Sequence, residues 1–394
     1  MPATLAKTRA SALAVNNNRF MDAPQNTGPT AGTDHISLAK PPERGKQTSA
    51  ALLLQPASLQ LPVERRNANA SIARTFQNAY LRLKTGEPSL SFKVPFFLAV
   101  AWLALTPAGF AQDRIPVLTT TTDLRSLVEA VGAERVAVTS IVPPNMDAEE
   151  YQTKPQDLVR LKNARMLVRI GLDYDLWLDP LIAQADNPAI RRGSPGYLDT
   201  SFGIPVLELR GMSVGPGDGH AHGNGNPHYW LDPKNAEILT ATIAETLGHV
   251  DPTHAAEYET NRKAFLARLE QKIAEWQNKL EPLRTMPMVA YHNSWPYFAR
   301  RFRLDFLAFI EAKPGVPPSP SHLAKIIQTM QARRVRIVVR EPHEPERDVA
   351  FVAGKTGAKV VTLAASVGSL PQANDYIALF DADVEALSAA AAVR

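Results

Sequence analysis

Three of the chain's nine histidines lie within nine residues of a glycine-rich stretch. His220, His222 and His228 belong to the segment 217–228, where glycine lets the backbone bend until side chains converge on one point. Imidazole nitrogen is a borderline-soft donor that suits Zn²⁺. The spacing therefore predicts metal binding, with a solvated surface turn as the alternative for His220 and His222.

His228 differs from the other two because structured sequence follows it. The residues Asn-Pro-His-Tyr-Trp-Leu-Asp-Pro at 226–233 lead into a run at 234–247 with apolar side chains at helical spacing. An Asp-Pro pair before such a run is typical of a helix start. We therefore expect a helix entrance to fix His228, and we expect His220 and His222 to form a flexible auxiliary arm that collects metal.

Other potential donors stand where predicted strands end, and open parallel sheets bind ligands beyond the carboxyl ends of their strands. His292 follows a predicted strand at 288–291, and Glu341 follows one at 336–340, with His343 two residues further on. In isolation, His292 would fit a hydrogen-bonded core histidine and Glu341 a proline-bounded loop. Their shared position at strand ends favours a binding site.

A further strand end adds carboxylates. Asp147, Glu149 and Glu150 follow a predicted strand at 136–142. A solvated turn or a helix N-cap would also explain such a cluster. Together with His228, the cluster places donors from both halves of the chain around one predicted cleft.

These donors need a scaffold, and the hydropathy pattern predicts an α/β fold. Strands that alternate with amphipathic helices are typical of parallel βαβ units, and here they form two lobes. In the first lobe we expect strands at 115–120, 136–142 and 166–170 and helices at 122–131, 155–164 and 176–185. In the second we expect strands at 288–291, 306–310, 336–340 and 359–363 and helices at 295–302, 321–331, 346–356 and 375–390.

One long segment joins the two lobes. Residues 252–283 contain no glycine, have prolines only near their ends, and carry apolar residues at near-helical spacing. At 1.5 Å per residue such a helix would span roughly 40 Å. We expect a bridging helix at 252–283 between an N-terminal lobe at 112–251 and a C-terminal lobe at 284–394, with the metal cleft between the lobes.

The first part of the chain has a different character. Residues 1–92 show no sustained apolar period, which predicts a disordered segment or a mis-assigned N-terminal extension, with translation beginning near residues 82–93. Residues 93–111 have a lysine, about a dozen apolar residues and a small-x-small end, the pattern of a secretory signal peptide. The apolar run is too short to span a membrane, which takes about 20 residues.

Charge and cysteine content narrow the class of protein. Residues 1–111 hold 12 basic and 5 acidic residues, which leaves 31 basic and 34 acidic residues, a net of −3, for the rest. The basic character thus belongs to the leader, and no nucleic-acid partner is expected for the folded part. The absence of cysteine excludes disulfides, zinc–thiolate sites and a lipid-anchor cysteine. We expect a soluble, monomeric periplasmic protein.

Five segments of the chain carry a family resemblance: 151–158, 226–233, 291–298, the pair Glu341-Pro342 and residues 368–371. With these segments, residues 114–394 resemble the zinc/manganese-type periplasmic solute-binding proteins of ABC importers. The resemblance implies two α/β lobes, a long bridging helix, a four-ligand metal site and delivery of the metal ion to a membrane permease.

The resemblance also implies a ligand set. Two family ligands map onto His228 and His292, whereas Glu149 stands where the family usually has its first histidine. Ala364 stands where an aspartate is usual and cannot bind metal, so Glu341 is the expected replacement, with His343 and Glu150 as less certain candidates. Two imidazoles and two carboxylates suit Zn²⁺, with Mn²⁺ as the second choice. Affinity should fall below about pH 6–7, because protonated imidazole cannot bind metal.

Two other functions remain open from the sequence. A binder of a metal chelate or an organic solute could share the architecture. A zinc hydrolase would need an open coordination position and a general base, for which Glu150 or Glu344 could serve. The sequence has no His-Glu-x-x-His motif, so no enzymatic activity is expected.

Overall fold

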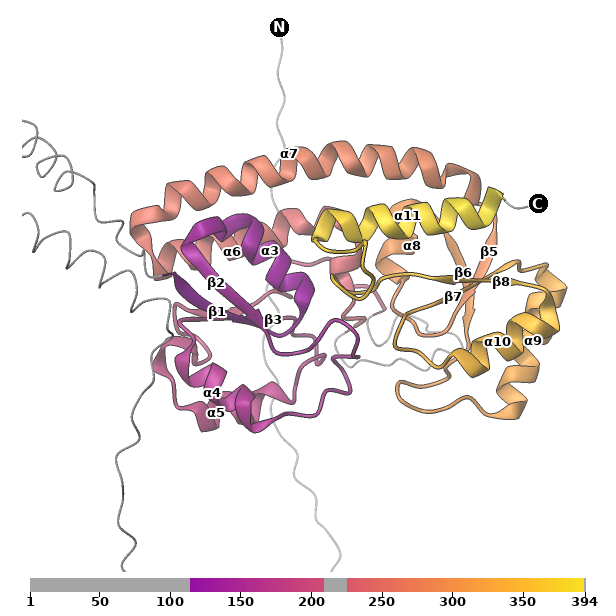
Figure 1. Ribbon diagram of the computed structural model, residues 1–394, viewed down its shortest axis with the longest axis horizontal. Helices are drawn as coiled ribbons and strands as arrows, with labels where there is room; N and C mark the ends of the chain where they lie inside the picture. The colour runs from indigo at the N-terminus through magenta and orange to yellow at the C-terminus, as the bar shows by residue number, and fades with distance from the viewer. Residues whose placement is uncertain (1–113, 209–224, 393–394) are drawn as a thin grey trace, which may run out of the picture. The chain divides into compact units, whose positions relative to one another are not determined.

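The computed structural model describes residues 114–208 and 225–392, and all of them belong to one compact unit. The signal peptide predicted at 93–111, the extension at 1–92, and His220 and His222 lie outside the described residues. Two parallel four-stranded sheets and a long helix that links them make up the described fold (Figure 1). This arrangement confirms the predicted fold class.

The first sheet begins the described part of the chain. Its strand order is β2-β1-β3-β4, and every pair is parallel. Helices α3 and α6 lie on one side of it, and α4 and α5 on the other (Figure 1). The elements are β1 (Ile115–Thr119), α3 (Thr122–Gly132), β2 (Val136–Ser140), α4 (Pro155–Asn163), β3 (Met166–Arg169), α5 (Leu178–Ala185), β4 (Tyr197–Asp199) and α6 (Ala236–Val250).

The structure departs from the sequence prediction in this lobe at strand β4 and at the start of helix α6, besides shifts of two residues at the start of α5 and the end of β2. Strand β4 was not predicted, because three residues are too few for a period-two pattern; its pairing with β3 places it. Helix α6 begins at Ala236 rather than at residue 234, because Pro233–Asn235 form a 3₁₀ turn. The Asp232 side chain caps this turn by accepting from the backbone N–H of Lys234.

The second sheet repeats the topology of the first. Its order is β6-β5-β7-β8, again with every pair parallel, so in both sheets the first strand lies between the second and the third. Helices α9 and α10 pack together on one side of it (Figure 1). The elements are β5 (Pro287–Ala290), α8 (Pro296–Phe302), β6 (Asp305–Phe309), α9 (Pro320–Arg333), β7 (Ile337–Arg340), α10 (Glu346–Thr356), β8 (Lys359–Thr362) and α11 (Tyr376–Ala392).

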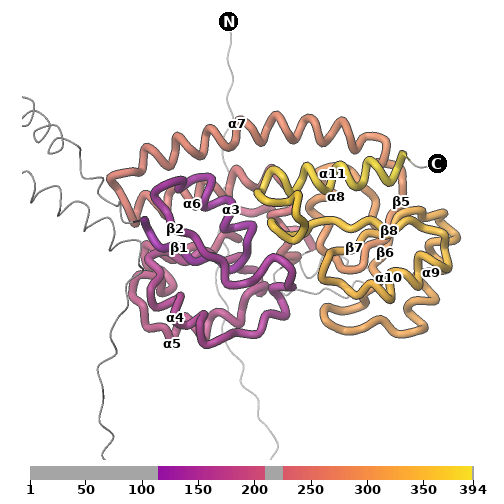
Figure 2. Tube along the Cα trace, in the orientation of Figure 1, coloured from indigo at the N-terminus to yellow at the C-terminus, as the bar shows by residue number. Residues whose placement is uncertain are grey.

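The long helix α7 (Ala255–Leu280) has 26 residues and lies between two 3₁₀ turns, Pro252–His254 and Glu281–Leu283. It packs against α3 and α6 of the first lobe and against α8 and α11, and Figure 2 shows it running over both lobes. A buried stripe makes these contacts: Tyr258, Phe265, Leu269, Ile273, Trp276 and Leu280. The bridging helix predicted at 252–283 is therefore present.

The segment that follows Asn226 connects the lobes. The Trp230 indole Nε1 donates to the carbonyl of Ala365 at 2.9 Å, and Arg301 of α8 donates through Nε and Nη2 to the buried Asp232 carboxylate at 2.6 and 3.0 Å. Such a two-pronged arginine–carboxylate pair fixes distance and orientation together. The residues around His228 are thus held by both lobes.

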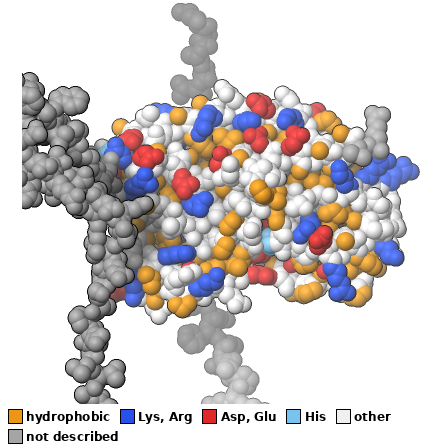
Figure 3. Space-filling view, viewed as in Figure 1, with side chains coloured by type: hydrophobic (Ala, Val, Ile, Leu, Met, Phe, Trp, Pro, Cys, Tyr) orange, Lys and Arg blue, Asp and Glu red, His pale blue; other side chains and the backbone are white. Residues whose placement is uncertain are grey.

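The surface gives two further observations. On the face shown in Figure 3, acidic and basic side chains are interspersed over the described residues. None of the described helices combines the length and the apolar character that a membrane crossing requires.

Candidate metal centre

Among the described residues, one group of three ligands converges. Atoms of Glu149, His228 and His292 all lie within 4.8 Å of one another. Both histidines are buried: 4% of the surface of His228 and 7% of the surface of His292 is exposed. Their ring centroids are 5.4 Å apart. Glu149 and His228 come from the first lobe and His292 from the second, so the group joins the two lobes.

Asn226 fixes the orientation of His228. The amide oxygen of Asn226 accepts from the backbone N–H of His228 at 3.0 Å and lies 3.1 Å from its ring Nδ1. The amide nitrogen of Asn226 donates to Glu208 Oε2 and to the carbonyl of Asn293, which settles which end of the amide is oxygen. Nδ1 therefore donates, and Nε2 is the metal-facing nitrogen, 3.9 Å from Glu149 Oε1.

A carboxylate fixes the orientation of His292, again through the ring nitrogen Nδ1. His292 Nδ1 lies 2.6 Å from Glu311 Oε2, and the other oxygen, Glu311 Oε1, accepts from the backbone N–H of Gly315 at 2.9 Å. The pair is buried. A histidine that donates to a carboxylate through one nitrogen presents the other to a metal ion with increased basicity.

Local hydrogen bonds shape the turn that carries Glu149. Asp147 Oδ1 accepts from the backbone N–H of Glu149 at 2.8 Å, and Trp177 Nε1 donates to the carbonyl of Ala148 at 2.8 Å. The Glu149 side chain is 11% exposed. The acidic cluster is therefore a hydrogen-bonded turn that directs one carboxylate inward.

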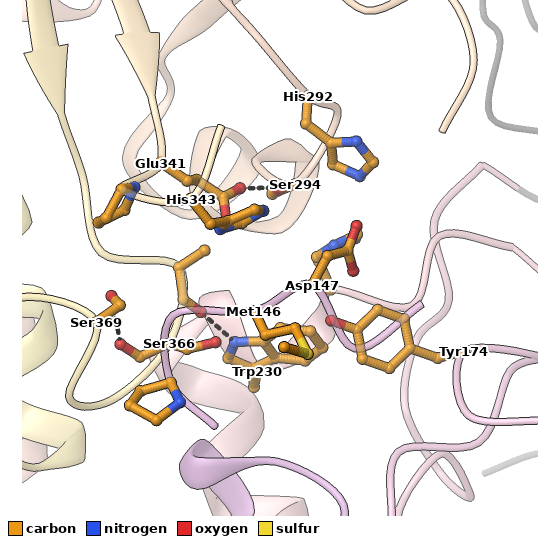
Figure 4. A pocket seen from close by; sticks show the side chains of 14 residues that line it. Met146, Asp147, Tyr174, Trp230, His292, Ser294, Glu341, His343, Ser366 and Ser369 are labelled. Carbon is orange, nitrogen blue, oxygen red and sulfur yellow. Dashed lines mark hydrogen bonds and ion pairs between the residues drawn. The ribbon is translucent and has the colours of Figure 1, made fainter. Parts of the chain in front are cut away.

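The other predicted ligands lie beside the group rather than in it. Glu341 is buried after β7 and accepts from the Ser294 hydroxyl, while its Oε2 is 3.7 Å from His343 Nδ1. Figure 4 shows Glu341, His343 and His292 around one cavity, which His228 also lines. Glu150 lines an adjoining cavity instead.

Ala364 offers no ligand in the place where the family resemblance leads one to expect an aspartate. The residue is fully buried, and its backbone N–H donates to Asp383 Oδ1 of α11 at 2.7 Å. The carboxylate of Asp383 is therefore engaged in holding this loop.

Burial and neighbouring charges change the acidities of these groups. Burial raises the pKa of Glu149 to about 8; the charge of His292 opposes the shift, and the carboxylates of Asp147 and Glu311 add to it. Burial disfavours a charged His292, but the hydrogen bond that His292 donates to Glu311 and the negative charge of Glu149 outweigh burial and raise the pKa of His292 to about 10. Burial also raises the pKa of Glu341. A metal ion must therefore displace protons to bind.

Two positioning residues were not predicted from the sequence. Glu311 lies two residues after the end of strand β6, and the strand-end rule that selected His292 and Glu341 would have selected it too. Asn226 stands in the Asn-Pro-His segment, but nothing in the sequence shows that its amide turns back to the ring two residues on. The structure brings Glu149, His228 and His292 together, and it adds these two partners.

Comparison with known proteins places this centre in a family. The ZnuA family, described as zinc-uptake complex component A, periplasmic, matches residues 117–390. The chain belongs to the ZnuA family. ZnuA-family proteins are non-enzymatic components of metal ABC uptake systems, so this chain binds a divalent metal for uptake and is not a hydrolase.

The individual relatives have low sequence identity to this chain, but the matches cover most of the length of each relative. A putative metal-binding protein of Treponema pallidum is 28% identical over 272 residues, covering 68% of this chain and 84% of the relative. The high-affinity zinc uptake protein ZnuA of Brucella abortus is 27% identical over 303 residues, covering 68% and 89%. The crystal structure of a zinc-bound ZnuA deletion mutant is similar with a TM-score of 0.61 at 28% identity, covering 72% of this chain and 100% of that chain.

Proposed function

We propose that this ZnuA-family chain captures Zn²⁺ in the periplasm and delivers it to the membrane permease of an ABC importer. The observation that carries the proposal is the convergence of Glu149, His228 and His292 within 4.8 Å, with both rings held through Nδ1. Two imidazoles and a carboxylate form a donor set that Zn²⁺ accepts readily. The name of the Brucella relative, a zinc uptake protein, supports the same metal.

The fourth coordination position is assigned to water. Glu341 faces the same cavity, but its Oε1 accepts from the Ser294 hydroxyl and its ligand atoms are not part of the converging group. In this proposal Glu341 contributes negative charge beside the ion, and His343 lies next to Glu341. The cavity of about 20 Å³ has room for about one water molecule.

Mn²⁺ is the competing cargo. Glu149 offers a hard carboxylate oxygen at the position where the family usually has a histidine nitrogen, and hard oxygen donors favour Mn²⁺. Calorimetric titration of the purified protein with Zn²⁺ and with Mn²⁺ separates the two. We expect one tight Zn²⁺ per chain and weaker binding of Mn²⁺. Tighter binding of Mn²⁺ would reverse the assignment of the cargo but not of the site.

The same titration tests the site. His228→Ala, His292→Ala and Glu149→Ala should each weaken Zn²⁺ binding, whereas His249→Ala, an exposed histidine of α6, should not. Unchanged Zn²⁺ affinity in both His228→Ala and His292→Ala would refute the proposal. An intact near-ultraviolet circular dichroism spectrum in each variant establishes that only the site has changed.

The proposal also covers the role of His220 and His222, the role of residues 93–111 and the oligomeric state. His220 and His222 act as a collecting arm, so their joint replacement by alanine should slow capture at low Zn²⁺ and leave the stoichiometry unchanged. Residues 93–111 act as a signal peptide, which a mature N-terminus near Gln112 in mass spectrometry would support. The protein works as a monomer, which light scattering of the zinc-loaded protein tests.

A further inference from the structure

A carboxylate behind the candidate metal centre contacts both lobes. Glu208 Oε2 accepts from the side-chain amide nitrogen of Asn226 at 3.1 Å and from that of Asn293 at 3.0 Å. Asn226 stands two residues before His228, and Asn293 directly follows His292. A single oxygen atom therefore holds the two segments that carry the histidine ligands.

The amide of Asn226 links this oxygen to the metal centre. Its nitrogen donates to Glu208 and to the backbone carbonyl of Asn293, and its oxygen faces the backbone N–H and the ring Nδ1 of His228. An amide group has two N–H donors and one acceptor oxygen, so all of its polar atoms are used. The contact with Glu208 and the contact with the His228 ring thus lie at opposite ends of one planar group.

Burial makes the contact with Glu208 important for both asparagines. Asn226 and Asn293 are buried, whereas Glu208 is partly buried. A buried N–H group that loses its acceptor is costly, so it turns toward another acceptor where the space allows. Without the Glu208 carboxylate, the amide of Asn226 could turn toward the space that the side chain leaves, and its oxygen would then move away from the His228 ring.

The backbone that carries Glu208 is fixed next to it. Leu207 accepts through its carbonyl from the backbone N–H of Asn226 at 2.9 Å. The hydroxyl of Tyr297, on helix α8, accepts from the backbone N–H of Leu207 at 3.0 Å and donates to the carbonyl of Asn226 at 2.9 Å. Glu208 itself has φ of +57°, which is uncommon for a residue other than glycine and persists only where the surroundings fix it.

The two ligand histidines therefore each have a carboxylate behind them, at different distances along the hydrogen-bond network. Glu311 contacts the His292 ring directly, whereas Glu208 reaches the His228 ring through the amide of Asn226. A neutral amide between carboxylate and ring passes on position, and it keeps the negative charge away from the imidazole. Glu208 is thus placed to set the geometry of His228.

We propose that Glu208 is a positioning residue of the metal centre. Through Asn226 it fixes the His228 ring, and through Asn293 it links that ring to the segment that carries His292. The part of this inference that concerns metal affinity rests on the proposed function of the centre. The part that concerns the ring does not, because the state of His228 can be measured in the metal-free protein.

Three substitutions of Glu208 test the role of its oxygen by Zn²⁺ affinity, measured by competition with a chelator. Glu208→Ala should weaken binding by about tenfold, the lower end of the range for outer partners of metal ligands, because Glu208 acts through another residue. Glu208→Gln keeps an acceptor oxygen for the two asparagines and should lose less than about threefold. Glu208→Asp keeps the charge but draws the oxygen back, and should resemble Glu208→Ala.

The ring nitrogens of His228 and His292 give the second measurement, by NMR of the metal-free protein. In Glu208→Ala the shifts of His228 should change from those of the Nδ1–H tautomer to those of a mixture, because the Asn226 oxygen no longer fixes the proton. The His292 ring, which Glu311 holds, should keep its shifts. A general loss of folding would alter both rings, so the selective change identifies the positioning role.

The matched control is Glu257→Gln on helix α7. Glu257 is also a partly buried carboxylate, and it accepts from Arg135 Nε at 3.0 Å, in a contact that involves none of the residues of the centre. It should change the Kd for Zn²⁺ by less than about twofold and leave both rings unchanged.

Three results would overturn the inference. They are unchanged Zn²⁺ affinity in Glu208→Ala, an unchanged His228 ring in that variant, and equal losses in Glu208→Gln and Glu208→Ala, which would make the charge rather than the acceptor oxygen responsible. If Glu208→Ala fails to fold, Glu208→Asp supplies the same two measurements. Absence of Zn²⁺ binding in the unmodified protein would instead count against the proposed function, and the NMR measurement would still test Glu208.

Discussion

His228 and His292 present the same nitrogen to the candidate metal centre, but the two lobes hold them with partners of different charge. His228 donates to the neutral amide of Asn226, and His292 donates to the carboxylate of Glu311. An amide fixes the ring without changing its charge balance, whereas a buried carboxylate also favours the imidazolium. The first lobe therefore supplies geometry, and the second lobe supplies geometry and negative charge.

The neighbourhoods of the two rings follow the same division. Tyr174 and Trp230 pack against the His228 ring, with centroids at 5.5 and 5.2 Å. His292 instead lines the cavity that adjoins the centre, together with the carboxylates of Glu311 and Glu344. His228 is therefore held by a neutral hydrogen bond and by ring packing, whereas His292 is held mainly by charge.

The largest effect should come from removing either ring. A four-ligand zinc site is worth roughly 10–16 kcal/mol, so one ligand contributes about 3 kcal/mol, or about 100-fold in Kd. We therefore expect His228→Ala and His292→Ala each to weaken Zn²⁺ binding by about 100-fold or more, measured by competition with a chelator.

The two variants should differ in stability without metal. His292→Ala leaves the buried Glu311 without its charged partner, and breaking such a pair costs about 3 kcal/mol. His228→Ala leaves the amide of Asn226 with its bonds to Glu208 and Asn293. Urea unfolding should therefore show a larger loss for His292→Ala, and equal losses would contradict the division between the lobes.

The next effect is the dependence of Zn²⁺ binding on pH. With the pKa of His292 raised to about 10, the ring is protonated at neutral pH, and each unit of pH below 10 costs a factor of ten in apparent affinity. Between pH 8 and pH 6 we expect affinity to fall by about 100-fold or more, with Glu149 adding to the loss as pH falls through its pKa of about 8. An unperturbed histidine would give only about a fourfold change.

Zn²⁺ affinity should thus fall over a higher pH range than it would with a histidine of ordinary pKa. Chelator competition at pH 6, 7 and 8 measures it, with His292→Ala and His228→Ala as the pair that sharpens the comparison. The residual binding of His292→Ala should lose the part of the dependence that comes from the ring and keep the part that comes from Glu149, whereas that of His228→Ala should keep both parts. The same steep dependence in both variants would show that His292 is not its source.

A smaller effect is expected from the positioning residue Glu311. Replacing Glu311 by Gln keeps one acceptor oxygen for two donors, His292 Nδ1 and the backbone N–H of Gly315. Loss of such an outer partner typically costs about 10–100-fold in metal affinity. Zn²⁺ affinity should fall in this range, and the NMR shifts of the His292 ring should report a mixed tautomer, a change that a purely structural role would not produce.

The fold could be predicted from the sequence because the patterns that indicate its helices and strands are local. The alternation of strand and helix patterns, and the glycine-free stretch at 252–283, depend on residues close together in the chain. Strand β4 was missed since its three residues belong to the sheet through pairing with β3 rather than through their own pattern. Where an element is short, its neighbours in space determine it.

The same limit applies to the centre. His228 and His292 could be selected by motif and strand end, and Glu149 by its place in the family pattern. Glu311 lies 19 residues from its partner His292, and only the pairing of β5 with β6 brings the two together. The positions of Glu341 and Ser294, 47 residues apart, likewise depend on the tertiary fold.

The smallest effect is expected at Glu341, the residue predicted from the sequence as the fourth ligand. Because one of its oxygens accepts from the Ser294 hydroxyl and its atoms lie outside the converging group, Glu341→Gln should remove charge but no metal ligand. Burial raises the pKa of Glu341, which reduces the negative charge that it carries beside the ion, so Zn²⁺ affinity should fall by about tenfold or less. A loss near 100-fold, equal to that of His292→Ala, would instead make Glu341 a true ligand. The second lobe would then supply two of the four donors, and the negative charge assigned to Glu311 would have a second source.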